Sequence, residues 1–571
     1  MPKLKIKSKY KKYKESSKKS QGSSIDLKER LAEKRKAEEA RQKMINFIVV
    51  CIFLGLLFGV PLGFLVEPKL GIGFFMGISV MLFSWQYPRP ALWLFLIYMP
   101  FSGSVTYWVG GGNALFQLAK DSIYIPALIA LVAECRRKKL PIIVPKKLIP
   151  TFSVLLVFVI LTLFSVNGIQ EFLPQCNAAL YSARIACKDG LPFFQGILGL
   201  KVLLGYVPLI FCAYYLIEDK KKLLFLGRLL VVLAIICCLL GLLQYWKLRT
   251  GSCIGTRGAV GDALFKASLQ AKCLVGGSLL YSPEQGVIRL PGTFVSPWHW
   301  AWFLIANSAL CFTTAFSDRS FFWRVVGLVG MGLVFINAVI CGQRIALGLV
   351  PVVILTLLIL TGQITNFKRF IPIGAGLGLL LGIWIVSNPT VVQQRVDSFV
   401  GRWNASPPQA FIESQFKYSI NKQRGIFGRG LGKATNSTRS LGKTALIETY
   451  HPKLLYEIGY PGLLAFLIFV THLTILSYRD YRSIRDPTLR NFASSFWVFI
   501  LIISFFPYWY PLDTDPVAIY YWFLAGVVFK LPIIDKQERQ KEQLLVEKEK
   551  NGSKTKTPRF KKFRTRKVGT L

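Results

Sequence analysis

The sequence predicts an all-α fold: a polytopic transmembrane helical bundle of about 12–14 spans, with one large outer loop between late spans. Composition is the first reason, because 53% of the 571 residues are hydrophobic and 14% are aromatic, which is too apolar for a soluble domain. The second reason is that many apolar runs reach the ~20 residues needed to cross a bilayer. The third is that the short basic loops between these runs all fall on one side when sides alternate along the chain.

Fourteen apolar runs are candidate spans. Two of them, 91–103 and 121–134, are short, and three consecutive glycines at 110–112 lie between them, which predicts broken or re-entrant helices. The first run is long enough to be a permanent span rather than a cleaved signal. In order, the runs are 44–66, 70–87, 91–103, 121–134, 149–166, 198–217, 223–246, 295–316, 322–341, 345–362, 370–387, 454–477, 491–510 and 516–533.

Much of the net charge of +42 lies in two basic tails, 1–43 and 534–571, which flank a transmembrane domain at 44–533. Tails and short loops of this kind follow the positive-inside rule, so the charge does not indicate nucleic acid as a partner. Residues 23–43 can form a charged helix, but they carry too few apolar side chains to bury a face. We therefore expect this tail to be solvated or to lie against the headgroups of anionic membrane lipids.

Placing the N-terminus in the cytoplasm puts every short basic cluster on the cytoplasmic side. The chain is then a multi-pass protein of the cytoplasmic (inner) membrane, with both termini in the cytoplasm. Three long loops face outward: 167–197, 247–294 and 388–453. The last of these is basic although it lies outside. Long loops often escape the charge rule, but a ligand that carries phosphate would also account for this charge.

Cysteine usage agrees with this orientation. One outer loop holds Cys176 and Cys187, and another holds Cys253 and Cys273. An even number in each loop predicts two local disulfides in an oxidising compartment, although pairing between the loops also fits the count. The other seven cysteines fall in spans or at their ends, where they behave as small apolar residues.

A set of cationic and titratable residues falls on the outer side by the same topology: Arg289, Arg344, Arg395, Arg402 and His451. A guanidinium fork matches phosphate oxygens with two hydrogen bonds, and an imidazole can accept a proton near neutral pH. Each residue also has a plain structural interpretation. The arginines can snorkel to the interface, and His451 can merely cap a helix. Glu457 lies inside the start of a span, so we expect its carboxylate to face the protein interior.

Several common sites are excluded by spacing. Three widely separated histidines, without a cluster of cysteines or carboxylates, give no metal site. The glycine-rich run at 425–432 follows no βαβ pattern, and the chain has no Walker A loop, so we predict no nucleotide site and no cofactor.

Taken in chain order, these features resemble those of the O-antigen ligase and O-antigen polymerase superfamily, over about residues 200–480. The resemblance rests on Arg289 before Gly-Thr-Phe, the turn at Gly342-Gln343-Arg344, and a late outer loop with arginines on a helix. It continues with a glycine turn at 428–432 and with His451 shortly before Glu457-Ile-Gly-Tyr-Pro-Gly. Two positions depart from the family: Gln343 stands where serine is frequent, and Pro452 where asparagine is frequent. The tails and the spacing also resemble cyanobacterial exopolysaccharide proteins, such as those of hormogonium polysaccharide synthesis.

The resemblance implies a metal-independent glycosyltransferase on the outer, periplasmic face, which polymerises or ligates a polyprenyl-diphosphate-linked glycan in cell-surface polysaccharide synthesis. The acceptor is a second glycan or a lipid, and polysaccharide-export machinery is a further partner. His451 is the expected general base, Glu457 orients it or tunes its charge, and Arg289 and Arg344 stabilise the diphosphate. The expected substrate-binding residues are Arg402, Arg395, Gln343 and Arg429. An outer helix near 391–403 would cover the site as a lid.

Two other classes of function remain open at this point. A transporter or flippase for an anionic solute or a lipid-linked glycan would explain broken helices and membrane charge. However, the sequence has no inverted repeat, and its charge lies in outer loops rather than at mid-membrane depth. A scaffold for polysaccharide machinery would use the tails as docking arms and predicts that Arg289, Arg344 and His451 are dispensable.

Overall fold

A computed structural model describes residues 3–554 except 113–115, 117–118, 178–185, 261–272, 278, 283–286, 364–378, 380–381, 384–385, 388, 406 and 507–510. For residues 3–30, residue 33, residues 548–554 and part of α16 (Pro389–Ala405), it describes the backbone alone. The chain divides into two compact units, which are taken in turn. The first comprises Met1–Phe95 and Ala114–Leu131, and the second comprises Leu96–Asn113 and Val132–Leu571.

The first unit is built on a hairpin of two long helices, α1 (Lys3–Leu65) and α2 (Pro68–Gln86), in which Pro68 starts the second helix. The two backbones touch through glycines. A side chain added at Gly59 would lie 2.7 Å from the carbonyl oxygen of Gly71, and one at Gly71 would lie 2.5 Å from the Cα atom of Gly63. Small residues at such spacing allow helices to pack closely within a bilayer. The same unit holds most of α5 (Ala119–Arg137) and the start of α3 (Pro88–Tyr98).

The N-terminal tail is helical from Lys3 and runs without a break into the first span, so its helix starts earlier than the expected residue 23. Good helix formers such as lysine, glutamate, alanine and arginine dominate it, and the span that follows supplies a helical template. Its described side chains between residues 31 and 43 are exposed, as a solvated tail requires.

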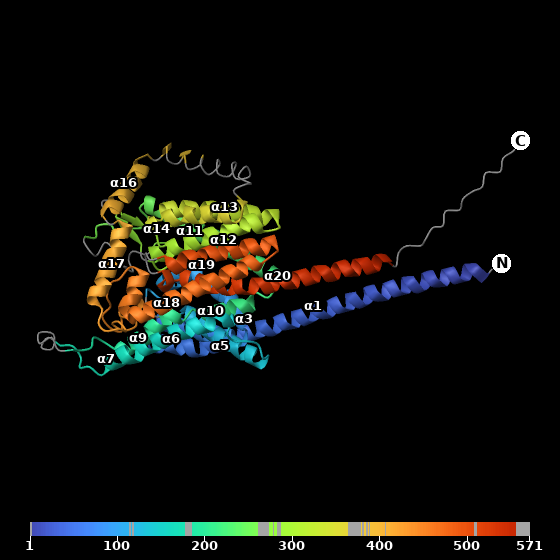
Figure 1. Cartoon of the computed structure of the whole chain (residues 1–571), viewed down its shortest axis with the longest axis horizontal. Coiled ribbons are helices and arrows are strands. Elements are labelled where there is room, and N and C mark those ends of the chain that lie inside the picture. The colour runs from blue at the N-terminus through green and yellow to red at the C-terminus, as the bar shows by residue number, and fades with distance from the viewer. Residues whose placement is uncertain are drawn as a thin grey trace. The chain divides into compact units, whose positions relative to one another are not determined.

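The second unit is a bundle of helices that carries a two-stranded antiparallel sheet at one end. Leu280 pairs with Arg289 in that sheet. Figure 1 shows α11, α12, α13 and α19 running side by side, while α16 and α17 cross one end of them. The helices and strands are α6 (Ile149–Thr162), α7 (Ile169–Glu171), α9 (Pro192–Leu204), α10 (Leu209–Leu216), α11 (Lys220–Arg249), β1 (Leu280–Ser282), β2 (Val287–Arg289), α12 (Pro297–Ser317), α13 (Phe321–Ile340), α14 (Arg344–Leu360), α17 (Pro408–Lys422), α18 (Tyr450–Ser483), α19 (Pro487–Phe505) and α20 (Val517–Lys554).

Helix α12 lies at the centre of this bundle and is buried along almost its whole length. Its side chains are mostly apolar and none is a lysine, arginine, aspartate or glutamate, which is typical of a helix enclosed by other helices. Large aromatic side chains such as Trp300, Trp302 and Phe303 fill the space around it. Helices α11, α13, α14 and α19 pack against it, so the core of the unit is a helical one, as the sequence predicts.

Among the described residues, eleven helical segments are long and apolar enough to cross a membrane, which shows a multi-pass membrane protein. The segment Arg344–Leu360 is apolar but shorter. The expected short span at 91–103 is in fact part of a longer helical stretch, Pro88–Val109, that passes through 3₁₀ and π turns. The expected span at 198–217 falls within one segment long and apolar enough to cross a membrane, Pro192–Leu216, in which a turn at 205–208 separates α9 from α10. The candidate span at 370–387 falls largely outside the described residues.

The two ends of the bundle in the second unit differ in chemistry. At one end, which we call the ionic end, Lys220 pairs with Asp486, and the backbone N–H of Asp486 donates to Asp535. Arg228 also pairs with buried Asp318 through two hydrogen bonds of 2.8 and 2.9 Å. All of these residues lie on the side of the bundle that the positive-inside rule assigns to the cytoplasm.

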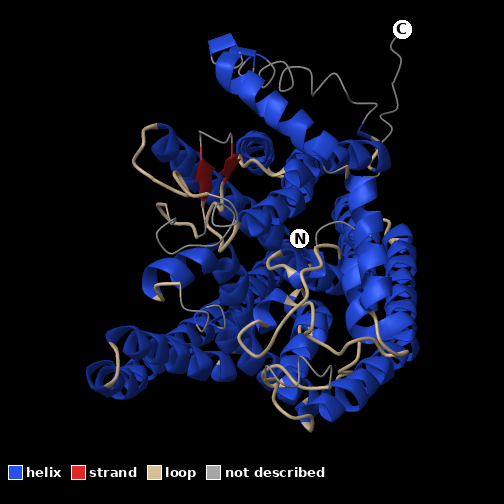
Figure 2. Cartoon of the chain, turned by 90° about the vertical axis from the view of Figure 1, so that its left-hand side faces the viewer, coloured by secondary structure: helices blue, strands red, loops and turns tan. Residues whose placement is uncertain are grey.

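The opposite end, which we call the loop end, carries the strands, both disulfides and the glycine-rich loop. In Figure 2 this end faces the viewer. Both predicted local disulfides form there, between Cys176 and Cys187 and between Cys253 and Cys273. The alternating arrangement of helix ends agrees with the predicted topology, while the side of the membrane that each end faces stays a prediction.

Candidate functional site

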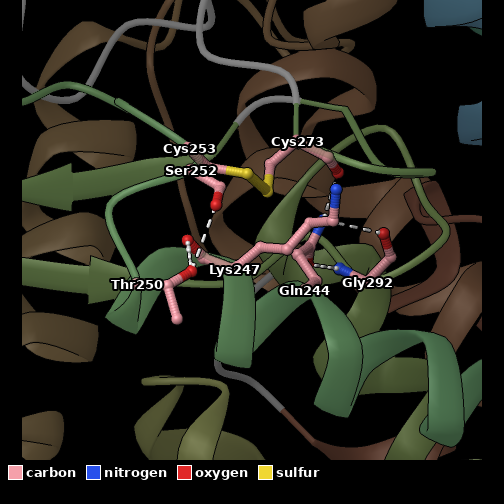
Figure 3. The surroundings of a disulfide bond; sticks show 7 residues. All are labelled: Gln244, Lys247, Thr250, Ser252, Cys253, Cys273 and Gly292. Carbon is pink, nitrogen blue, oxygen red and sulfur yellow. Dashed lines mark hydrogen bonds between the residues drawn. A yellow bond between two sulfur atoms is a disulfide. The ribbon is translucent and has the colours of Figure 1, made fainter.

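Arg289 stands at the end of β2, in a small folded loop that the second disulfide helps to hold. Cys253 and Cys273 pack with Leu248, Tyr281 and neighbouring apolar residues in one buried cluster. The side chain of Gln244 on α11 ties this loop to the bundle, since its amide donates to the carbonyl oxygen of Cys273 over 2.9 Å (Figure 3). It also exchanges hydrogen bonds with the backbone of Gly292, just after β2. The position of Arg289 is therefore fixed by local packing.

The structure brings Arg289 close to the turn that carries Arg344. The N–H of Leu290 donates to the carbonyl oxygen of Cys341 over 3.1 Å. Gly342 has a φ of +71°, and a side chain there would lie 1.8 Å from the carbonyl oxygen of Ile288, so only glycine fits. Arg289 and Arg344, which are 55 residues apart in the sequence, thus lie on adjoining backbone.

Gln343 and Arg344 open helix α14. Gln343 is the N-cap residue, and its carbonyl oxygen accepts from the N–H groups of Ala346 and Leu347. The Gln343 side chain is buried, and its Nε2 atom has no hydrogen-bond partner among the described residues. Arg344 is the first helical residue and is partly exposed. The N-terminus of a helix has a positive dipole end, which adds to the positive potential of the arginines.

Glu448 is an acidic residue of this region that the sequence reasoning missed. Its backbone N–H donates to the Oε1 atom of Gln415 on α17 over 2.9 Å, which fixes the segment before α18. Burial raises the pKa of the Glu448 carboxyl above its usual value, and the nearby guanidinium of Arg289 opposes that rise. The charge of Arg289 therefore acts on a residue only three positions before His451.

His451 is the second residue of α18 and is partly buried. The N-cap residue of the helix is Thr449, and the imidazole of His451 lies near the backbone of Ser504 at the end of α19. In a neutral imidazole one ring nitrogen carries a proton and the other can accept one. The arrangement disfavours the interpretation of His451 as a helix cap.

Glu457 is buried, as expected, but it contacts the glycine-rich loop. Its Oε1 atom accepts from the N–H of Ala434 over 2.7 Å and from the hydroxyl of Thr435 over 3.0 Å. The same helix kinks at Gly459, which has a φ of +69° and lies against the carbonyl oxygen of Ile426. These contacts of Glu457 support a structural role, since they hold the loop rather than the imidazole.

Two buried amides hold the other side of this loop. Asn167 donates to the carbonyl oxygen of Leu431 over 3.0 Å and accepts from its N–H over 2.8 Å, as a neighbouring strand would. Gln195 on α9 donates to the carbonyl oxygens of Gly432 and Lys443. A glycine run that sequence alone presents as flexible is therefore clamped, which requires partners more than 200 residues away.

Arg429 belongs to the same loop. Its N–H donates to the carbonyl oxygen of Tyr456 over 2.8 Å, and its Nε atom donates to the carbonyl oxygen of Lys422 at the end of α17. Part of its guanidinium thus closes a helix end, as basic side chains often do. Its assignment to substrate binding stays a prediction.

Another contact that the sequence did not reveal is the buried ion pair between Lys453 on α18 and Asp513. Lys453 is two residues after His451, and Asp513 belongs to the short turn between α19 and α20. Removing one partner of a buried pair leaves an uncompensated charge, so the pair fixes the start of α18 against this turn.

Arg395 and Arg402 lie on α16, which forms where the sequence predicts the helix at 391–403. Their side chains are outside the described part of the structure, so their predicted contacts with a diphosphate are not placed. The described side chains Val396, Val400 and Trp403 form an exposed apolar stripe on that helix. In the described residues, no group of three or more potential metal ligands lies together.

Comparison with known proteins adds no family assignment. No protein-family model matches the chain, and no curated protein matches it significantly. The site is therefore interpreted from its own residues.

Proposed function

We propose that the chain is a membrane glycosyltransferase that transfers a glycan from a polyprenyl-diphosphate carrier to a hydroxyl group of a glycan or lipid acceptor. The observation that carries this proposal is the meeting of Arg289 and the Gln343–Arg344 turn on adjoining backbone, with Glu448 and the His451 segment beside them. The resemblance to the O-antigen ligase and polymerase superfamily, whose motifs occur in the same order along the chain, supports the same chemistry.

The proposed reaction is a displacement at the anomeric carbon. The acceptor oxygen forms a bond to that carbon while the bond from carbon to the diphosphate oxygen breaks, and the electron pair leaves with the polyprenyl diphosphate. The acceptor proton passes to the unprotonated ring nitrogen of a neutral His451, a contribution worth roughly 10²–10⁴-fold. Arg289 and Arg344 stabilise the charge that grows on the leaving diphosphate. Fixed cations of this kind typically lower the barrier more than any other single contribution.

The direct test uses purified protein in lipid nanodiscs with a polyprenyl-diphosphate-linked repeat unit as donor. The proposal predicts release of free polyprenyl diphosphate together with a lengthened or relocated glycan. Movement of the intact lipid-linked donor across a vesicle membrane, without cleavage of its glycosyl bond, would instead support the transporter interpretation. A deletion strain then separates the two transferases: single lipid-linked repeats accumulate without a polymerase, and full-length lipid-linked polymer accumulates without a ligase.

A further inference from the structure

The loop end carries an unusual run of positive charge. Between residues 417 and 443, the chain has seven lysines and arginines and no aspartate or glutamate. This run starts in the second half of α17 and continues through the glycine-rich loop. By the predicted topology it lies outside, where the charge rule does not favour lysine and arginine. The charge therefore calls for another physical reason.

Five of these cations are exposed, and together we call them the outer basic patch: Lys417, Lys422, Arg424, Arg439 and Lys443. Two of the five have acidic neighbours. Lys417 pairs with Glu413 one helical turn away, and Lys443 lies 3.4 Å from Asp189. Exposed pairs of this kind contribute little and exchange readily with other anions. The patch therefore keeps most of its positive potential toward solvent.

The patch lies on a firmly held surface. The N–H of Arg429, in the middle of the run, donates to Tyr456 on α18, and the backbone of Lys443 is held by Gln195. The N–H of Ala445 donates to the carbonyl oxygen of Lys433 over 2.7 Å, which closes the loop on itself. Fixed charges bind a polyanion with a smaller entropy loss than charges on a free tail.

Charge of a single sign concentrated in one exposed segment is unfavourable for the folded protein by itself and is relieved by an anionic ligand. The pKa of Lys433, beneath the patch, is lowered by burial, while Asp189 and Glu171 oppose that change. These two acids lie toward α7 and α9, whereas the acidic neighbour on the α17 side is Glu413, which pairs with Lys417. A long, flexible polyanion fits such a surface better than a single small anion does.

We propose that the outer basic patch binds an acidic polysaccharide, namely the glycan chain that the enzyme transfers or lengthens. This inference rests on the proposed function and gives its substrate a chemical class: a glycan that carries carboxylate or sulfate groups. The segment that carries the patch contacts the site through α18. The N–H of Arg429 donates to the carbonyl oxygen of Tyr456 on α18, and His451 is the second residue of that helix. A chain that extends from the acceptor position can therefore follow the patch outward.

The test measures binding of polygalacturonate oligomers to the full-length protein in phosphatidylcholine nanodiscs, with neutral dextran of equal length for comparison. In the test variant, the five patch residues are changed to glutamine: Lys417→Gln, Lys422→Gln, Arg424→Gln, Arg439→Gln and Lys443→Gln. The matched control removes five exposed cations of the ionic end, with the same change in net charge: Arg136→Gln, Arg137→Gln, Lys139→Gln, Lys221→Gln and Arg319→Gln.

We expect the patch variant to bind polygalacturonate at least about tenfold more weakly, with a smaller dependence on salt, because fewer counterions are released. The control variant should bind like the wild type, and dextran should not bind. Equal affinity in both variants, or equal binding of dextran, overturns the proposal. The proposal is also overturned if the patch variant loses binding to phosphatidylglycerol vesicles but keeps its binding to polygalacturonate, since the patch would then be a lipid site.

The same variants separate this inference from the proposed function. A donor with one short neutral repeat does not reach the patch, so the patch variant should transfer it at the wild-type rate. If polygalacturonate binding depends on the patch but His451→Ala leaves transfer intact, the proposed active site fails while the polysaccharide surface stands.

Discussion

Glu457 offers the sharpest test of how this site is built. Its carboxylate is buried and accepts two hydrogen bonds from the glycine-rich loop, from Ala434 and Thr435. In Glu457→Ala, both donors lose their acceptor inside the protein. A hydrogen bond to a charged group contributes about 1.5–3 kcal/mol, so the two together give a loss of about 3–6 kcal/mol. Glu457→Gln keeps an acceptor oxygen at the same place and should lose only about 1–2 kcal/mol.

The assay combines thermal unfolding of the purified protein with limited trypsin digestion, since the loop carries Arg424, Arg429 and Lys433 as cleavage sites. We expect Glu457→Ala to unfold at a lower temperature and to be cleaved in this loop, while Glu457→Gln stays close to wild type in both. Wild-type unfolding and full trypsin resistance in Glu457→Ala would refute the structural role. A shifted pH profile of transfer in Glu457→Gln, with unchanged stability, would show that the residue tunes His451 instead.

Three further predictions concern topology, disulfides and pH. Reporter fusions at Lys138 and Ile484 should signal cytoplasm and one at Asn436 the outside; a cytoplasmic signal at Asn436 would remove His451 from any outer substrate. Non-reducing peptide mapping should recover the Cys176–Cys187 and Cys253–Cys273 peptides, each bridge stabilising by ~2–4 kcal/mol; free thiols at all four positions would contradict the oxidising outer side. Because the folded-state pKa of Glu448 is raised by burial, ionising this residue destabilises the fold above the unfolded pKa of about 4.3. Glu448→Gln should therefore be more stable than wild type at pH 7, and this advantage should vanish toward pH 4; an advantage that does not change with pH would contradict the assignment.

Hydropathy predicted the helical core well, because a span of the required length must satisfy its own backbone hydrogen bonds whatever surrounds it. The span at 198–217 was also predicted, since it falls within the apolar segment Pro192–Leu216, but the turn at Gly205–Pro208 that separates α9 from α10 was not expected. The N-terminal helix is longer than expected, because helix formers next to a span extend it at little cost.

Part of the candidate site could also be predicted from the sequence, and part could not. That Arg289 and Arg344 share an end of the bundle follows from counting spans, and the even cysteine number in each loop predicted the bridges. The partners of Glu457 and Lys453 did not follow, since they come from a loop and a turn whose positions only the folded chain determines. Sequence spacing places residues on a face, but it does not show which distant backbone donor meets a buried carboxylate.

The central claim is that His451 and Arg344 perform glycosyl transfer. The most direct measurement is polymer formation from purified lipid-linked donor by the wild type, His451→Ala and Arg344→Lys, with Arg319→Ala at the ionic end as control and with membrane protein levels matched. Arg344→Lys keeps the charge but loses the planar fork that grips a diphosphate, so it should be nearly as inactive as Arg344→Ala. His451→Ala should lose roughly 10²–10⁴-fold in rate while still binding donor, and Arg319→Ala should match the wild type. Full activity in both His451→Ala and Arg344→Lys would contradict the proposed active site.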